Sequence, residues 1–130
     1  MGMKMKFLVV DDDLDMARYI AVILESEGVS SDIADSAEVA RKLFILNDFD
    51  ALLIDGILPG ESDLSLAKGL REFNPDIPVL FCTGAIDEFN IKLLGSIGMV
   101  CHKPLGERFP SIIRQFVQSF IAPIEPQLND

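Results

Sequence analysis

The stretch FLVVDDDLDM, from Phe7 to Met16, places four apolar residues directly before four carboxylates that fall within five positions. A short apolar run of this kind is typical of a buried strand. The acidic half needs a separate explanation, because the chain of 130 residues already has a net charge of −10 and these side chains repel one another. The step from Val10 to Asp11 therefore marks both the end of a strand and a candidate functional site.

Five short apolar runs, of which this is the first, alternate with longer segments of helical periodicity. The runs cover residues 6–10, 29–33, 50–54, 77–82 and 99–102, and the helical segments cover residues 14–27, 36–46, 62–73, 88–97 and 107–121. The first, third and fourth runs are apolar on both faces, as expected for parallel strands covered by helices, whereas the second is polar enough for an edge strand. The alternation predicts an α/β fold of the (βα)₅ type with a doubly wound parallel sheet.

Capping residues indicate where several of the helices begin and end. Gly28 is placed to end the first helix, and Ser62 to cap the third. Asp35, with Glu38 three residues later, fits a capping box at the start of the second helix. Val39 is expected in the buried stripe of that helix.

Composition narrows the classes of function. Eleven basic against 21 acidic residues argue against direct binding of nucleic acid or of an anionic membrane surface. No apolar run approaches the roughly 20 residues of a membrane-spanning helix. Cys82 and Cys101 have neither the spacing of a metal site nor the number expected of a disulfide framework. We therefore expect a cytoplasmic protein with two buried thiols.

Chemically distinctive residues follow four of the five predicted strands. Asp11 and Asp12 follow the first strand, Asp55 the third, Thr83 the fourth and Lys103 the fifth. Because the carboxyl ends of parallel strands lie along one edge of a sheet, these residues are expected to share a site. Two carboxylates about 4 Å apart repel by about 4 kcal/mol at an effective dielectric near 20, so a divalent cation is indicated among them. Hard oxygen ligands suit Mg²⁺.

The segments VVDDD (9–13), LLIDGILPG (52–60), PVLFCTG (78–84) and HKPL (102–105) carry these residues in order along the chain. Together they resemble the receiver domain of two-component response regulators. The resemblance covers residues 5–121 and leaves 122–130 as a linker-like or disordered tail. It implies a flavodoxin-like fold with strand order 2-1-3-4-5.

The resemblance also implies how Mg²⁺ would be held. Asp12 and Asp55 would be direct ligands, and Asp11 would lie close by or act through a water molecule. The backbone carbonyl of Ile57 would complete the protein's share of the ligands.

For catalysis, the resemblance implies that Asp55 accepts a phosphoryl group. Lys103 would neutralise charge on that group, and the hydroxyl of Thr83 would hydrogen-bond one of its oxygens. The domain would be a signalling receiver that catalyses only its own phosphorylation and dephosphorylation.

The partners implied are a sensor histidine kinase or a histidine phosphotransfer protein, and a downstream effector domain or protein. Direct contact with nucleic acid or with a membrane is not expected. A homodimer through the last helix is an alternative to packing of its Phe116 and Phe120 against the sheet.

Three positions depart from the pattern of the family. Val100 stands three residues before Lys103, where the family usually has Tyr or Phe, so a rotating ring is not expected to transmit the signal. Ile57 and Ala85 stand two residues past Asp55 and Thr83, along the route of an attacking water. Neither side chain can orient or deprotonate that water, so slow loss of the phosphoryl group is expected.

Two other functions remain open at this point. Asp11 and Asp13 match the D-x-D of haloacid dehalogenase-type hydrolases, although no acidic pair follows Lys103 and the chain leaves no room for a cap domain. A receiver-like docking module that is never phosphorylated is the second alternative, against which the complete set of strand-end residues argues. Asp13 and Asp15 are interpreted as acids that cap and charge the first helix.

Overall fold

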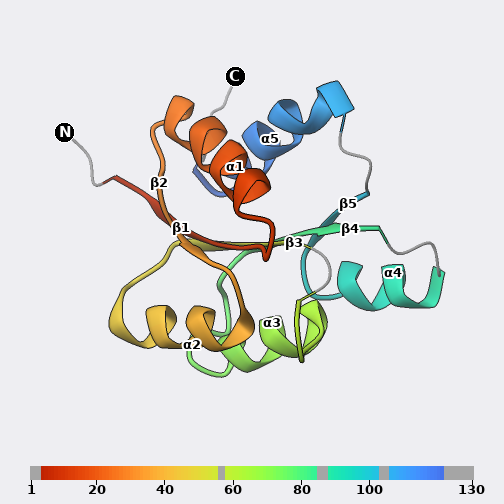
Figure 1. The fold of residues 1–130 in the computed structure, drawn as a ribbon. Helices are drawn as coiled ribbons and strands as arrows, with labels where there is room; N and C mark the ends of the chain where they lie inside the picture. Colours follow the sequence, from red (N-terminus) through yellow and green to blue (C-terminus); the bar gives the residue numbers. More distant parts are fainter. Residues whose placement is uncertain (1–3, 56–57, 85–87, 103–105, 122–130) are drawn as a thin grey trace, which may run out of the picture.

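The computed structural model describes residues 4–55, 58–84, 88–102 and 106–121, and these form a single five-stranded sheet between two layers of helices (Figure 1). The strands are β1 (Lys6–Val10), β2 (Ser30–Ala34), β3 (Ala51–Asp55), β4 (Val79–Thr83) and β5 (Met99–His102). All four neighbouring pairs are parallel, in the order β2-β1-β3-β4-β5. The predicted fold class and strand order are therefore confirmed.

Five α-helices connect or follow the strands. They are α1 (Leu14–Ser26), α2 (Ala37–Leu46), α3 (Asp63–Arg71), α4 (Glu88–Gly95) and α5 (Phe109–Ile121), and a single 3₁₀ turn over Gly106–Arg108 precedes α5. Figure 1 shows α1 and α5 on one face of the sheet and α2, α3 and α4 on the other. None of the helices in the described ranges has the length and hydropathy needed to cross a membrane.

The alternation of side chains along the central strands divides the core into two clusters. Leu8 of β1 and Leu52 of β3 pack on the side of α2 and α3, whereas Phe7 and Leu53 pack on the side of α1 and α5. Every residue of β3 and β4 is buried, because helices cover both faces of these strands. Both faces of the middle strands are thus shielded from water.

The start of α2 differs from the sequence prediction. The hydroxyl of Ser36, not the carboxylate of Asp35, caps the helix by accepting a hydrogen bond from the Val39 backbone N–H at 3.2 Å. The capping box of Asp35 and Glu38 was wrong, because the chain turns helical one residue later than that box requires. Val39 is 36% exposed, so its place in the buried stripe was also wrong. The predicted caps Gly28 (φ +78°) and Ser62 are confirmed.

Gly98 allows β5 to approach β4. A Cβ atom at Gly98 would lie 2.3 Å from the backbone oxygen of Val79, a distance that real Cβ atoms do not occupy. By contrast, a Cβ at Gly95, the last residue of α4, would meet no atom within 4 Å. The connection into β5 therefore requires glycine at position 98 for reasons of space.

Candidate functional site

Among the described residues, the buried polar side chains are those of Asp11, Asp55 and Thr83. They are 2%, 2% and 5% exposed, and all three lie at the C-terminal ends of β1, β3 and β4. We call the edge of the sheet formed by these strand ends the carboxyl edge. Burying a polar group is costly without compensation, so their concentration at one edge marks a candidate functional site.

Strand register brings Asp11 and Asp55 together. Val10 of β1 pairs with Ile54 of β3, and the two aspartates directly follow these partners. The backbone N–H of Asp11 donates to the carbonyl oxygen of Ala34 at 2.9 Å, which continues the pairing with β2 one residue past β1. The Asp11 Oδ1 atom accepts a hydrogen bond from the backbone N–H of Asp13 at 2.9 Å, which orients its carboxylate.

The other predicted metal ligands are the side chain of Asp12 and the backbone carbonyl of Ile57. Asp12 is exposed, and Ile57, whose carbonyl was predicted to bind Mg²⁺, lies outside the described residues. Within the described ranges, no three His, Cys, Asp or Glu side chains are grouped closely enough to hold a metal ion by themselves. The oxygen donors of Asp11, Asp12 and Asp55 fit Mg²⁺ in kind, so the metal site stays a prediction.

Thr83 is the last residue of β4, and its register partner is His102, the last residue of β5. Lys103 follows His102 in the chain but lies outside the described residues, as does Pro104. The register thus carries β5 to the carboxyl edge, beside the strand that ends in Thr83.

Comparison with known proteins agrees with this geometry. Residues 7–106 match the family model described as the response regulator receiver domain. The chain belongs to this receiver domain family. A relative in Pseudomonas aeruginosa, the phosphate regulon transcriptional regulatory protein PhoB, is 34% identical over 85 residues, which are 64% of this chain and 37% of PhoB.

Solved structures of similar proteins share the fold. A two-component response regulator from Clostridium difficile has a TM-score of 0.79 and 25% identity over 91% of this chain and 99% of that one. A CheY-like receiver domain protein from Methanospirillum hungatei has a TM-score of 0.80 at 23% identity, over 90% of this chain and 93% of its own, and shows the fold alone. The chain spans between about a third and two thirds of the length of the curated relatives it matches.

In this receiver domain, the remaining acids of the opening stretch serve α1. Asp13 is the N-cap, and its Oδ1 atom accepts hydrogen bonds from the backbone N–H groups of Asp15 and Met16 at 3.0 and 3.2 Å. Asp15 lies in the first turn and forms an exposed ion pair with Arg18 at 3.7 Å. The predicted capping role of Asp13 is therefore confirmed.

The two thiols lie beside the candidate site. Cys82 and Cys101 are register partners on β4 and β5, and Asp55 is the partner of Cys82 on the other side. Both cysteines are buried thiols outside any disulfide, as predicted. A hydrogen bond with Cys82 lowers the pKa of the Cys101 thiol, against the opposing effects of burial and of the negative charge on Asp55.

Val100, where the family usually has an aromatic ring, is partly buried and packs against the core cluster on the side of α2 and α3. An aliphatic side chain of this size fills space but has no ring to turn in or out. The receiver domain therefore lacks an aromatic switch at this position of β5.

One ionic contact in the segment between β3 and α3 is marked by no motif. Arg41 of α2 pairs with Glu61, which lies between β3 and α3. The two residues are 20 positions apart, and nothing in the sequence couples them. An acid flanked by glycine and serine looks like an ordinary loop residue, so only the packing of α2 against α3 reveals the pair.

Proposed function

We propose that this receiver domain accepts a phosphoryl group on Asp55 from a phosphohistidine of a sensor histidine kinase or histidine phosphotransfer protein. The observation that supports this best is the burial of Asp11, Asp55 and Thr83 together at the carboxyl edge. A carboxylate sealed at the end of a central strand contributes nothing to the hydrophobic core, so its position favours a chemical role.

The transfer itself is a displacement at phosphorus. A carboxylate oxygen of Asp55 forms the new P–O bond while the P–N bond to the partner's imidazole breaks, and the imidazole leaves with the bonding electron pair. Such reactions depend on positioning and on neutralisation of charge more than on covalent catalysis. The residues that would hold Mg²⁺ are Asp11, Asp12, Asp55 and the carbonyl of Ile57. When bound, the ion supplies positive charge to the transferred group.

Thr83 and Lys103 respond to the phosphoryl group in this proposal. The ammonium of Lys103 neutralises one of its oxygens, and the hydroxyl of Thr83 donates a hydrogen bond to another. The resulting movement at the end of β4 is the signal passed to a downstream effector domain or protein. Because Val100 has no ring, this signal either travels through Thr83 and the segment that follows it or leaves by a surface other than the family's usual one, which is formed by the fourth helix, fifth strand and fifth helix.

We further propose that the phosphorylated form is long-lived, because Ile57 and Ala85 cannot activate water. Purified domain phosphorylated at Asp55 should keep its phosphoryl group for many minutes at neutral pH. Loss within seconds, measured by intact mass after removal of the donor, would contradict this. Ala85→Glu is expected to shorten the lifetime of the phosphorylated form.

The test of the proposed function is incubation with acetyl phosphate and Mg²⁺, with intact mass as the readout. The wild type should gain the mass of one phosphoryl group in a Mg²⁺-dependent reaction, and Asp55→Asn should gain none. Lys103→Ala should impair the reaction far more than Asp13→Ala, whose side chain only caps α1. An unmodified wild type that also shows no structural response to beryllofluoride would favour the docking-module alternative.

The wider context is proposed from the same family membership. We propose that residues 5–121 form the receiver domain of a cytoplasmic signalling protein and that 122–130, which lie outside the described residues, form a linker-like tail. A homodimer through α5 is the alternative arrangement to test. Phe116 would not contribute to it, because this residue packs in the core, edge-on to Phe7 at 5.7 Å between ring centroids. Size-exclusion chromatography with and without beryllofluoride would detect the homodimer.

A further inference from the structure

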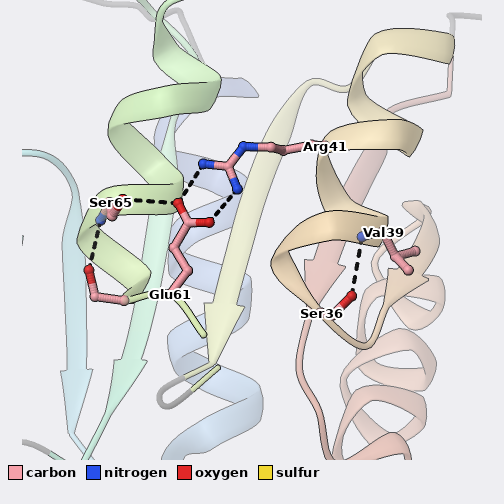
Figure 2. Close-up of polar contacts among 6 residues, drawn as sticks. Ser36, Val39, Arg41, Glu61 and Ser65 are labelled. Atoms are coloured by element: carbon pink, nitrogen blue, oxygen red, sulfur yellow. Dashed lines mark hydrogen bonds and ion pairs between the residues drawn. The ribbon is translucent and has the colours of Figure 1, made fainter. Parts of the chain in front are cut away.

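Glu61 lies between β3, the strand that ends in Asp55, and α3, and it is held by an ion pair with a residue of α2. The guanidinium of Arg41 on α2 donates hydrogen bonds from both Nη1 and Nη2 to the two carboxylate oxygens of Glu61 (Figure 2). The hydroxyl of Ser65, in the first turns of α3, donates to Glu61 Oε2 at 2.9 Å. One carboxylate thus joins α2, the loop and α3.

The surroundings favour this arrangement over a mobile surface pair. The side chain of Glu61 is 20% exposed and that of Arg41 is 40% exposed, and the hydrogen bonds from Arg41 hold the pKa of the Glu61 carboxyl below the ordinary value. A Cβ atom at Gly69 of α3 would lie 3.2 Å from Arg41 Nη2, so the absence of a side chain there lets the guanidinium lie against the helix. Bidentate pairs of this geometry are the ones that restrict position most strongly.

The residue that carries this carboxylate also ends a turn. Leu58 and Glu61 form an isolated antiparallel bridge around a turn in which Gly60 has φ +78°. Leu58 is buried in the cluster that packs against α2 and α3. One end of the turn is therefore held by the hydrophobic core and the other by Arg41. This turn begins three residues after Asp55 and ends where Ser62 caps α3.

We propose that Arg41 and Glu61 are positioning residues for phosphoryl acceptance at Asp55. Neither side chain would touch the phosphoryl group. Together they hold the turn 58–61 against α2 and so keep the carboxyl end of β3 in the geometry that the transfer requires. This inference rests on the proposed function of Asp55, and it assigns a role to two residues outside the motifs of the carboxyl edge.

The experiment measures the rate constant for phosphorylation by acetyl phosphate at fixed Mg²⁺, using intact mass after rapid quenching. Glu61→Gln and Arg41→Gln are each expected to lower it by roughly tenfold, less than the roughly 100-fold loss that a misplacement of 1 Å can cause. The double variant should be no slower than either single variant, because the two residues act as a unit. Arg41→Lys keeps the charge without the planar fork, and it should recover part of the rate.

Two control variants separate positioning from general stability and charge. Ser36→Ala removes the N-cap of α2, the helix that also carries Arg41 (Figure 2), and it weakens folding without touching the ion pair. Lys42→Gln removes the exposed pair with Glu38 at 3.6 Å and changes the net charge as Arg41→Gln does. Both should phosphorylate at the wild-type rate under conditions in which urea unfolding shows every variant to be folded.

The outcomes distinguish this inference from the function on which it rests. If wild type is phosphorylated on Asp55 and Glu61→Gln keeps the wild-type rate, the ion pair is only structural and the inference is overturned. The same conclusion follows if Ser36→Ala slows the reaction as much as Glu61→Gln does. If wild type itself is not phosphorylated, the proposed function fails and the positioning role fails with it.

Discussion

Replacing Asp55 with asparagine should stabilise the folded domain in the absence of Mg²⁺. Asp11 and Asp55 directly follow the register partners Val10 and Ile54, and both side chains are buried. Neighbouring strands are about 4.8 Å apart, so the two carboxylates on one face lie roughly 5 Å from each other. At an effective dielectric near 20 their repulsion is about 3 kcal/mol, of which surrounding groups screen a part. We expect Asp55→Asn to gain about 1–3 kcal/mol in free energy of unfolding.

Magnesium should cancel or reverse this difference in stability. An ion that binds only the folded state at 100 times its dissociation constant adds about 2.7 kcal/mol to the stability of wild type. The variant, which lacks one of the proposed ligands, should gain much less. Wild type and Asp55→Asn should therefore differ most in EDTA and converge or cross in saturating Mg²⁺.

Urea unfolding followed by circular dichroism, with EDTA or with Mg²⁺, measures both effects. Asp48→Asn is the matched control, because it makes the same change in net charge at an exposed position before β3, at the opposite edge of the sheet. It should respond to Mg²⁺ as wild type does. If Asp55→Asn is less stable than wild type in EDTA, or if Mg²⁺ stabilises both equally, the buried carboxylates do not form a cation site.

Three further predictions concern the framework around the site. Gly98→Ala should lower the free energy of unfolding by about 1–3 kcal/mol, because its methyl group would overlap the backbone of Val79. Gly95→Ala, whose Cβ would meet open space, should be neutral or raise the free energy of unfolding by up to about 1 kcal/mol. Equal urea midpoints for these two variants would contradict the close approach of β5 to β4. Cys82 and Cys101 should react with a thiol reagent only after unfolding in urea, and fast labelling of the native domain would refute their burial. Ser62→Ala should cost about 1 kcal/mol by removing the cap of α3, and an unchanged thermal midpoint would show that this cap contributes nothing.

The start of α2 shows where local sequence is not sufficient. Asp35 and Ser36 are both good capping residues, and only the path of the chain out of β2 decides which one is in the capping position. The same limit applies before α5, where the predicted helix from residue 107 begins with a 3₁₀ turn and the α-helix starts at Phe109. Helical periodicity identifies the helix, but the residue at which the helix begins depends on the path of the chain out of the preceding strand.

Local patterns were sufficient for the fold and for the core of the site. Apolar runs that need covering on both faces predict a parallel sheet, and a parallel sheet brings the carboxyl ends of all its strands to one edge. The sequence alone therefore groups Asp11, Asp55 and Thr83. The tertiary structure alone decided two contacts. The pair of Arg41 and Glu61 exists because α2 packs beside α3, and the requirement for Gly98 exists because β5 approaches β4 at Val79. Periodicity is a property of neighbouring residues in the chain, whereas these contacts join segments about 20 residues apart whose relative position depends on the packing of the whole domain.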